Sequence, residues 1–246
     1  MKEFFTGLFK KKNTKRIWEL DAFRGLCIIG VVIVHAIFDI RELFGFYFET
    51  PAWFDWIQTY GGILFVVLSG VCVTLGHHHI IRGVVVAVCA MIITLVTCLL
   101  FDRSLHIWFG VLHLLAFCML TYGLYRKLPW PVILGLGVCF VALGIWFTTF
   151  KVSNPYLFPL GLTAKGFAAG DYFPIFPHLG YFMIGVASGK TLYKNKVTLF
   201  KKVNDRNPVI RFFSFVGRHS LLIYMLHQPL VYGILFLISR LVNGAA

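Results

Sequence analysis

The chain has 246 residues, of which 59% are hydrophobic and only 13% are charged, and its formal net charge is +13. A soluble domain is about 45–50% apolar and about 25% charged, so this composition excludes an ordinary soluble protein and indicates a membrane protein. The positive charge does not indicate a nucleic-acid-binding protein, because it lies in short segments between apolar runs, where membrane topology selects for it.

Seven apolar segments predict the fold class. A helix that crosses a bilayer needs about 20 mainly apolar residues. We therefore expect an all-α membrane bundle of about seven helices, in one domain over 20–246 that follows a basic cytoplasmic segment, 1–19. The predicted crossings are about 20–40, 57–76, 83–101, 105–125, 129–149, 172–190 and 212–239. Within the last one, residues 208–216 are a candidate to lie along the inner interface before the chain turns upward.

The first segment is not a cleaved signal peptide, because Asp21 and Arg24 stand at its head and no small-residue cleavage site follows it. With the N-terminus in the cytoplasm, the inner segments hold 6 + 1 + 2 + 7 = 16 Lys and Arg residues, and the outer ones hold 5. This ratio satisfies the positive-inside rule. Seven crossings then put the C-terminus outside, and the predicted location is a cytoplasmic (plasma) membrane, in which the protein is integral.

The first segment, "ELDAFRGLCIIGVVIVHAIFDIRE", carries polar side chains along one helical stripe. Residues three or four apart share a face, which predicts that one stripe holds Asp21, Gly25, His35, Asp39 and Glu42. This face must look into the bundle, because ionisable groups facing lipid cost several kcal/mol. Asp21 lies near the inner surface, and His35 is roughly 21 Å above it, in the outer half of the membrane.

Histidines of other segments are predicted at the same depth. His106 and His113 lie seven residues apart in the fourth crossing, and His178 opens the sixth. In the last crossing a polar stripe is formed by Ser220, Tyr224, His227 and Gln228, followed by Pro229, which removes a backbone hydrogen bond and frees a carbonyl group. We therefore expect histidines from four crossings to converge on one zone.

Plainer interpretations stand beside these. A lone histidine in a membrane helix is often an interhelical hydrogen-bonding residue, and Asp21 with Arg24 is equally consistent with a structural ion pair. The run His77–His79 resembles a metal site, but three consecutive helical residues cannot all face one ion. A zinc site of His35, His113 and His178 is conceivable from their chemistry, without compact ligand spacing to support it. No metal is expected, and the six cysteines are expected to be small buried thiols.

Several segments resemble a known family. They are "RIWELDAFRGLCIIGVVIVHAIFD", "LFVVLSGVCVTLG", "FGVLHLLA", "FPHLGYFMIGVASGKTLY" and "FVGRHSLLIYMLHQPLVY", and they run in order over residues 16–232. Together they resemble the heparan-alpha-glucosaminide N-acetyltransferase-like transmembrane acyltransferases, as a short bacterial member. A more distant likeness is to membrane acyltransferases that O-acetylate surface polysaccharides.

The resemblance implies transfer of acetyl from cytosolic acetyl-CoA to a sugar or glycan on the far side. The residues expected to bind the donor at the inner mouth are Asp21, Arg24, Gly25, Arg218, His219, Ser220 and Tyr224. His227 and Gln228 are expected to bind the acceptor. In the lysosomal branch of the family the position of His35 is an asparagine and the catalytic histidine follows the first crossing, whereas residues 40–56 here contain none.

The resulting hypothesis makes His35 the general base, oriented by Asp39, with His113 or His178 as alternatives. His178 or Gln228 would stabilise the oxyanion, and a covalent acetyl-histidine intermediate is an alternative route. Two further hypotheses belong to other classes: a proton-coupled transporter that uses the buried His and Asp residues as a relay, and a non-catalytic membrane assembly protein. The acceptor, the choice between N- and O-acetylation and the oligomeric state are left open, and a homo-oligomer is one option.

Overall fold

The structure is a computed structural model that describes residues 16–43, 48–205 and 207–243. Its long helices are α2 (Trp18–Phe38), α3 (Ala52–Leu75), α4 (His79–Leu100), α5 (Val111–Tyr125), α6 (Trp130–Phe147), α7 (Ile175–Leu192) and α9 (Ser220–Asn243). Shorter elements are a π-helical turn (Asp39–Leu43), 3-10 turns (Arg103–Leu105 and Pro155–Leu160) and α8 (Pro208–Arg218). The all-α fold predicted from the sequence is confirmed.

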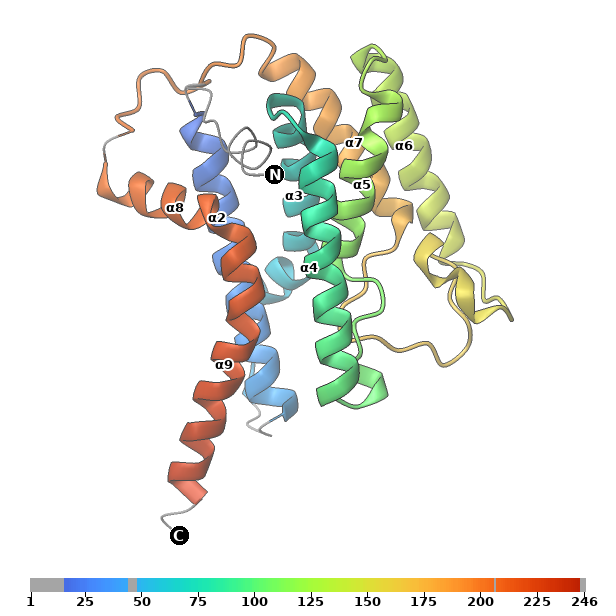
Figure 1. Cartoon of the computed structure of the whole chain (residues 1–246), viewed down its shortest axis with the longest axis vertical. Coiled ribbons are helices and arrows are strands. Elements are labelled where there is room, and N and C mark those ends of the chain that lie inside the picture. Colours follow the sequence, from blue (N-terminus) through green and yellow to red (C-terminus); the bar gives the residue numbers. More distant parts are fainter. Residues whose placement is uncertain (1–15, 44–47, 206, 244–246) are drawn as a thin grey trace, which may run out of the picture.

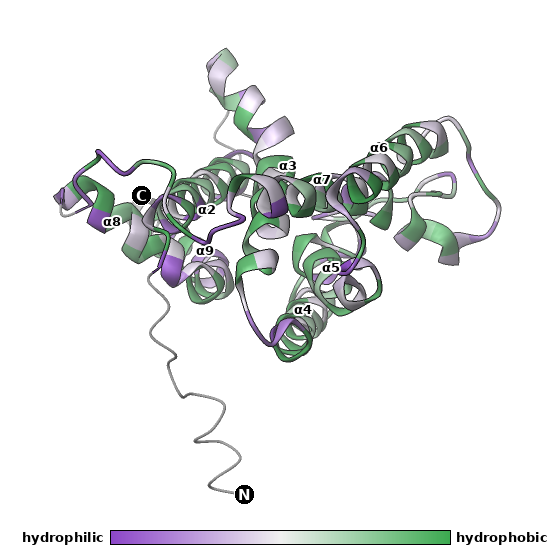
Figure 2. Cartoon of the chain, turned by 90° about the horizontal axis from the view of Figure 1, so that it is seen from above, coloured by the Kyte–Doolittle hydropathy of each residue, from purple (hydrophilic) through white to green (hydrophobic). Residues whose placement is uncertain are grey.

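Helices α3 and α7 form the middle of the bundle (Figures 1 and 2). α6 packs along the other side of α7, and α4 pairs with α5. α2 packs on α3 and carries α8 and α9, so the two C-terminal helices are held chiefly through α2. Half of the α9 side chains that the structure describes are exposed, as expected for a helix that faces lipid.

Five helical stretches of the described chain are long and apolar enough to cross a membrane. They are Trp18–Arg41, Ala52–Leu75, His79–Leu100, Trp130–Phe147 and Ser220–Leu241, and α5 is a shorter apolar helix. Every predicted crossing overlaps one of the long helices, while the number of crossings and the sides of the termini stay predictions. The predicted cytoplasmic segment lies outside the described residues up to position 15.

Glycines allow the closest helix crossings. Gly70 of α3 lies against the backbone of α7 at Phe182 and Gly185, and Gly137 of α6 lies against Gly180 of α7. A Cβ atom at either position would meet backbone atoms of the facing helix at 3.1 Å or less. Small residues let membrane helices approach closely, where van der Waals contact replaces the hydrophobic effect as the driving force.

Two predicted helix starts are wrong. The fourth crossing begins at Val111 rather than 105, and the sixth begins at Ile175 rather than 172. The reason is that the two approaching segments pair with each other: Gly170 N–H donates to the His106 carbonyl at 3.2 Å, and Phe173 N–H donates to the Phe109 carbonyl at 2.9 Å. Their backbone groups are therefore used in tertiary contacts instead of a helical ladder.

The last predicted crossing is two helices. α8 ends at Arg218 and α9 begins at Ser220, with a break at His219, where φ is −103° and ψ is 15°. α8 lies across the direction of α9 (Figure 1), and α9 continues through Pro229. The cysteines are all free, but Cys139 is exposed on α6, so the expectation that every thiol is buried is wrong at that position.

Candidate active site

An amide and a carboxylate join α2 to α9. The Nε2 atom of Gln228 donates to both carboxylate oxygens of Asp39, at 2.9 Å each, and Asp39 has no exposed surface. Because a carboxylate that accepts both bonds must face an N–H₂ group, the Gln228 Oε1 atom points elsewhere. The polar stripes predicted on these two helices therefore meet, through a residue pair that the sequence did not predict.

Beside this pair, His227 of α9 contacts His35 of α2, with 5.1 Å between the ring centroids. The Nδ1 atom of His227 lies 2.6 Å from the Tyr224 carbonyl oxygen. A carbonyl oxygen only accepts, so Nδ1 carries the proton and Nε2 of the neutral ring is a bare acceptor. Among the described residues, Asp39 bonds Gln228, and no hydrogen bond joins Asp39 to His35.

Two buried acceptor atoms on neighbouring residues have no hydrogen-bond partner among the described residues. These are Nε2 of His227 and Oε1 of Gln228. His227 is only 6% exposed. A buried polar atom without a hydrogen bond costs about 1–3 kcal/mol, so native proteins seldom keep one without a reason. Both atoms are available to accept a hydrogen bond from an N–H or O–H group. We name the set of His35, Asp39, His227 and Gln228 the α2–α9 polar cluster.

Asp171 connects this cluster to the other half of the bundle. Its Oδ2 atom accepts from the Val111 backbone N–H at 3.1 Å and lies 3.5 Å from the Tyr224 hydroxyl group. It therefore covers the N-terminus of α5, where a carboxylate is favoured. Tyr224, expected at the donor mouth, is instead buried against this contact. Asp171 was not predicted from the sequence. It could have been noticed there, because it is the sole acidic residue between Asp102 and Asp205.

Burial raises the pKa of the Asp171 carboxyl group to about 6, although the hydrogen bonds from Val111 and Tyr224 favour the charged form. Asp171 lies in the loop ahead of α7, outside the helices. Its protonation state therefore changes just below neutral pH, at the point where α5, α9 and this loop meet.

His113 is fully occupied by structural hydrogen bonds. Its Nδ1 atom accepts from the Gly110 N–H at 3.2 Å, and Nε2 is 3.1 Å from the Thr94 hydroxyl group. Thr94 in turn donates to the Ile107 carbonyl at 2.7 Å. Both ring nitrogens are thus used to hold the start of α5 against α4, which removes the support for His113 as the alternative base.

Of the histidines predicted to converge, His35 of α2 and His227 of α9 are in ring contact, and His106 and His178 each bond a carbonyl group close to them in the sequence. His178 Nδ1 bonds the Pro174 carbonyl at 2.8 Å, and His106 Nε2 bonds the Phe101 carbonyl at 3.0 Å. Among the described residues, no three side chains of the kinds that hold metals come together, and the conceivable zinc set of His35, His113 and His178 is not assembled. His79 bonds the Met119 carbonyl at 3.0 Å at the start of α4.

The structure differs at several residues from the donor-binding mouth that was predicted at the inner end of α2. Gly25 does not open a path for a ligand, because the backbone of α8 at Phe213 and Gly217 fills the space beside it. Asp21 pairs with Arg16 at 3.8 Å and lies within electrostatic reach of Arg24 and Arg218. The remaining predicted donor residues are at the break between the last two helices.

There, His219 Nδ1 bonds the Phe215 carbonyl at 2.9 Å, and Ser220 is the first residue of α9. Arg82 at the start of α4 interacts electrostatically with Arg24, so a second helix brings a cation to this end. The side chain of Glu42, the last member of the predicted α2 stripe, lies outside the described residues.

Residues 16–229 match the catalytic family described as "Heparan-alpha-glucosaminide N-acetyltransferase, catalytic". The chain belongs to this family. The match covers all four residues of the α2–α9 polar cluster, and it confirms the resemblance identified from the sequence motifs. Comparison with curated proteins and with solved structures gave no match.

Membership indicates a transferase of the acyltransferase class, and its apolar helices fit an integral membrane protein. The family uses acetyl-CoA as donor in general and acts on glycans. These properties agree with a bundle that buries unpaired hydrogen-bond acceptors between apolar helices, because acyl transfer requires a group that accepts a proton from the attacking nucleophile.

Proposed function

We propose that this protein transfers acetyl from cytosolic acetyl-CoA to an amine or hydroxyl group of an extracytoplasmic sugar or glycan, at the α2–α9 polar cluster. Family membership supports the reaction class. The observation that carries the choice of site is the buried, unpaired Nε2 atom of His227 in ring contact with His35. A neutral imidazole with one nitrogen bound to a carbonyl group and the other bare is arranged as a general base.

In the proposed reaction the acceptor N–H or O–H gives its proton to the His35–His227 pair as the nitrogen or oxygen attacks the thioester carbon. The tetrahedral adduct collapses, the C–S bond breaks, and the CoA thiolate takes the proton back from the imidazolium. His35 keeps the role predicted from the sequence as part of this pair. The lone pair that takes the proton is on Nε2 of His227, because Nδ1 carries the ring proton and donates it to the Tyr224 carbonyl. Positioned base catalysis contributes about 10²–10⁴-fold.

Gln228 and Asp39 act together as a positioning pair in this scheme. The amide N–H₂ group of Gln228 is used by Asp39, so Gln228 offers the substrate an acceptor rather than an oxyanion donor. The predicted oxyanion role of Gln228 is therefore withdrawn. The neutral His178 ring donates its N–H to the Pro174 carbonyl, so His178 is also withdrawn as the oxyanion donor.

The donor would bind at the end of the bundle where α2, α4 and α8 bring arginines together. Coenzyme A is polyanionic, and Arg24, Arg82 and Arg218 offer cations to its phosphate groups. Since α8 fills the space beside Gly25, the pantetheine arm would have to follow another face of α2 toward His35.

The test is acetyl transfer by purified protein from radiolabelled acetyl-CoA to a panel of amino and neutral sugars. His227→Ala and His35→Ala are each expected to lower kcat by about 10²–10⁴-fold if the altered ring takes the proton. His106→Ala is the matched control, because its ring also has one nitrogen on a carbonyl group and the other buried without a partner among the described residues, but it lies in the loop before α5, outside the α2–α9 polar cluster. It is expected to keep normal turnover. Full activity of both cluster variants would contradict the site.

The transporter hypothesis is separated by a second measurement. Protein in proteoliposomes that drives substrate-dependent proton flux without consuming acetyl-CoA would overturn acetyl transfer altogether. A non-catalytic assembly protein would show neither activity, and its His35 and Asp39 could be replaced by Asn or Leu without phenotype.

A further inference from the structure

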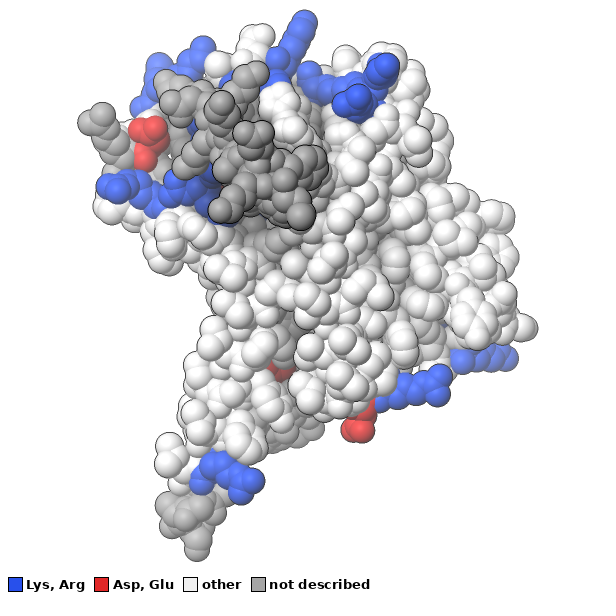
Figure 3. Space-filling model, viewed as in Figure 1, with Lys and Arg blue, Asp and Glu red and all other residues white. Residues whose placement is uncertain are grey.

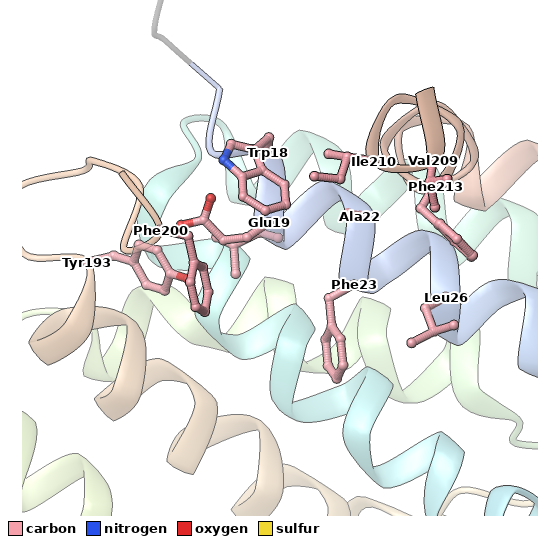
Figure 4. Close-up of a pocket in the computed structure, with 11 residues that line it drawn as sticks. Trp18, Glu19, Ala22, Phe23, Leu26, Tyr193, Phe200, Val209, Ile210 and Phe213 are labelled. Atoms are coloured by element: carbon pink, nitrogen blue, oxygen red, sulfur yellow. The ribbon is translucent and has the colours of Figure 1, made fainter. Parts of the chain in front are cut away.

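An apolar groove lies at the opposite end of α2 from the polar cluster (Figure 4). One wall is the face of α2 that carries Ala22, Phe23 and Leu26. α8 closes one side with Val209, Ile210 and Phe213, and the segment after α7 closes the other with Tyr193 and Phe200. The groove encloses about 440 Å³, which is within the range of about 300–1,000 Å³ typical of ligand sites.

One wall of the groove is fixed by a buried carboxylate. Glu19 Oε1 accepts from the Leu199 N–H at 2.8 Å, and Oε2 accepts from the Thr198 hydroxyl group at 2.9 Å. These bonds hold the segment that carries Phe200 against α2, where Phe200 also contacts Trp18 at 6.3 Å between ring centroids. The groove is therefore built by a tertiary contact. Both carboxylate oxygens of Glu19 accept hydrogen bonds from the segment that forms the groove wall.

α8 has the character of a helix that lies in the membrane interface. It runs across α2, and its surface away from the groove exposes Phe212 and Phe215 beside Arg211. An exposed apolar face with basic residues is typical of a helix seated between the headgroups and the acyl chains. A groove beneath such a helix opens at the depth where acyl chains begin.

Basic residues follow the groove-lining residues of two segments directly in the sequence. Lys201 and Lys202 follow the lining residue Phe200, and Arg211 follows Ile210; all three side chains are exposed. Within the described residues none of the three takes part in a salt bridge. The segment 190–211 holds seven Lys and Arg residues against one acid, Asp205.

We propose that this groove binds one anionic phospholipid from the leaflet at the basic end of the protein. An acyl chain lies between α2, α8 and Phe200, and the phosphate group is held by Lys201, Lys202 and Arg211. An apolar slot next to unpaired cations matches a molecule with an apolar tail and an anionic head. A neutral lipid would fill the apolar groove without contacting the cations through an anionic head, and a free phosphate would contact the cations without filling the groove. The lipid would brace α8 against α2.

The test uses the full chain in detergent, with phosphatidylglycerol and phosphatidylcholine of identical acyl chains as probes. Retained lipid is counted by native mass spectrometry. We expect one phosphatidylglycerol per chain, in preference to phosphatidylcholine. Lys201→Ala with Lys202→Ala is expected to weaken retention roughly 10- to 30-fold, at about 1 kcal/mol per basic residue near an anionic lipid. Ala22→Phe, which fills the slot, is expected to abolish one-to-one retention of both lipids.

The matched control is Arg126→Ala with Lys127→Ala, which removes two exposed cations from the turn between α5 and α6. These variants are expected to retain phosphatidylglycerol like the wild type. Equal retention of the two lipids, or an equal loss in the control, would overturn the proposal and indicate unspecific adsorption. Wild-type protein with no one-to-one adduct would also overturn it, because the groove would then be filled by the chain itself.

Discussion

Asp39 and Gln228 show how one residue pair fixes local chemistry. The carboxylate is fully buried, and both of its oxygens accept bonds from the amide. A buried charge without partners is costly, so each residue dictates the orientation of the other. The amide oxygen of Gln228 is thereby turned away from Asp39, and within the described residues it has no hydrogen-bond partner. The pair thus creates the acceptor site without itself taking a proton.

Gln228→Leu is expected to destabilise the protein by about 1–3 kcal/mol, since the Asp39 carboxylate keeps its burial but loses its donors. Thermal unfolding in detergent would report this as a lower apparent Tm. Adding Asp39→Asn to Gln228→Leu should recover part of the loss, because a neutral amide is cheaper to bury than a carboxylate. An unchanged Tm for Gln228→Leu would show that the pair contributes nothing measurable.

Asp171 predicts a pH dependence of stability. The pKa of its carboxyl group is about 6 in the folded protein, above the ordinary value of 3.8 for an aspartate, so the folded state binds the proton more tightly. Stability contributed by this group is therefore present below about pH 4 and is lost as the pH rises toward 6. Relative to the wild type, Asp171→Asn should gain stability over this window.

The measurement is the difference in Tm between wild type and Asp171→Asn at several pH values from 4 to 8. His113 and Tyr224 lie beside Asp171 and are present in both proteins, so the difference isolates the carboxyl group. A constant difference across the range would contradict the raised pKa.

At the scale of elements, α2 and α8 are held together by direct backbone contact. Gly25 lies against the Phe213 carbonyl, and Gly217 lies against the Asp21 carbonyl. A side chain at either position would force the two helices apart, because backbone atoms cannot move aside as a flexible side chain can. This contact also sets the position of α8 over the lipid groove.

Gly25→Ala and Gly217→Ala are each expected to lower the Tm and to weaken lipid retention together. Gly135→Ala on α6 is the matched control, because no atom lies within 4 Å of a Cβ there. Alanine favours a helix over glycine by up to about 1 kcal/mol, so the control should be neutral or slightly stabilised. Equal Tm values for all three variants would contradict a tight crossing.

For the whole molecule, cations gather at the end that carries α8 and the turn between α5 and α6, and fewer lie at the other end (Figure 3). The sequence count of 16 inner against 5 outer Lys and Arg residues predicts that the crowded end faces the cytoplasm. This orientation places the arginines of the proposed donor mouth on the side where acetyl-CoA is made, and the polar cluster farther out.

Cysteine labelling tests this orientation. In a cysteine-free background, Lys165→Cys should react with a membrane-impermeant maleimide in intact cells, and Lys127→Cys should react only after permeabilisation. The reverse pattern would invert the topology and place the cation-rich end outside. It would also contradict acetyl-CoA binding at Arg24 and Arg218.

The sequence by itself determined the helix class, the approximate helices, the family and the polar faces of α2 and α9. These features depend on composition, on the spacing of residues along one helix and on motifs in order. Only the tertiary structure decided which polar faces meet. It brought Gln228 to Asp39, occupied His113 with Gly110 and Thr94, and set α8 on Gly25. Periodicity orients a side chain on its own helix, whereas a partner on another helix is fixed by how the helices pack.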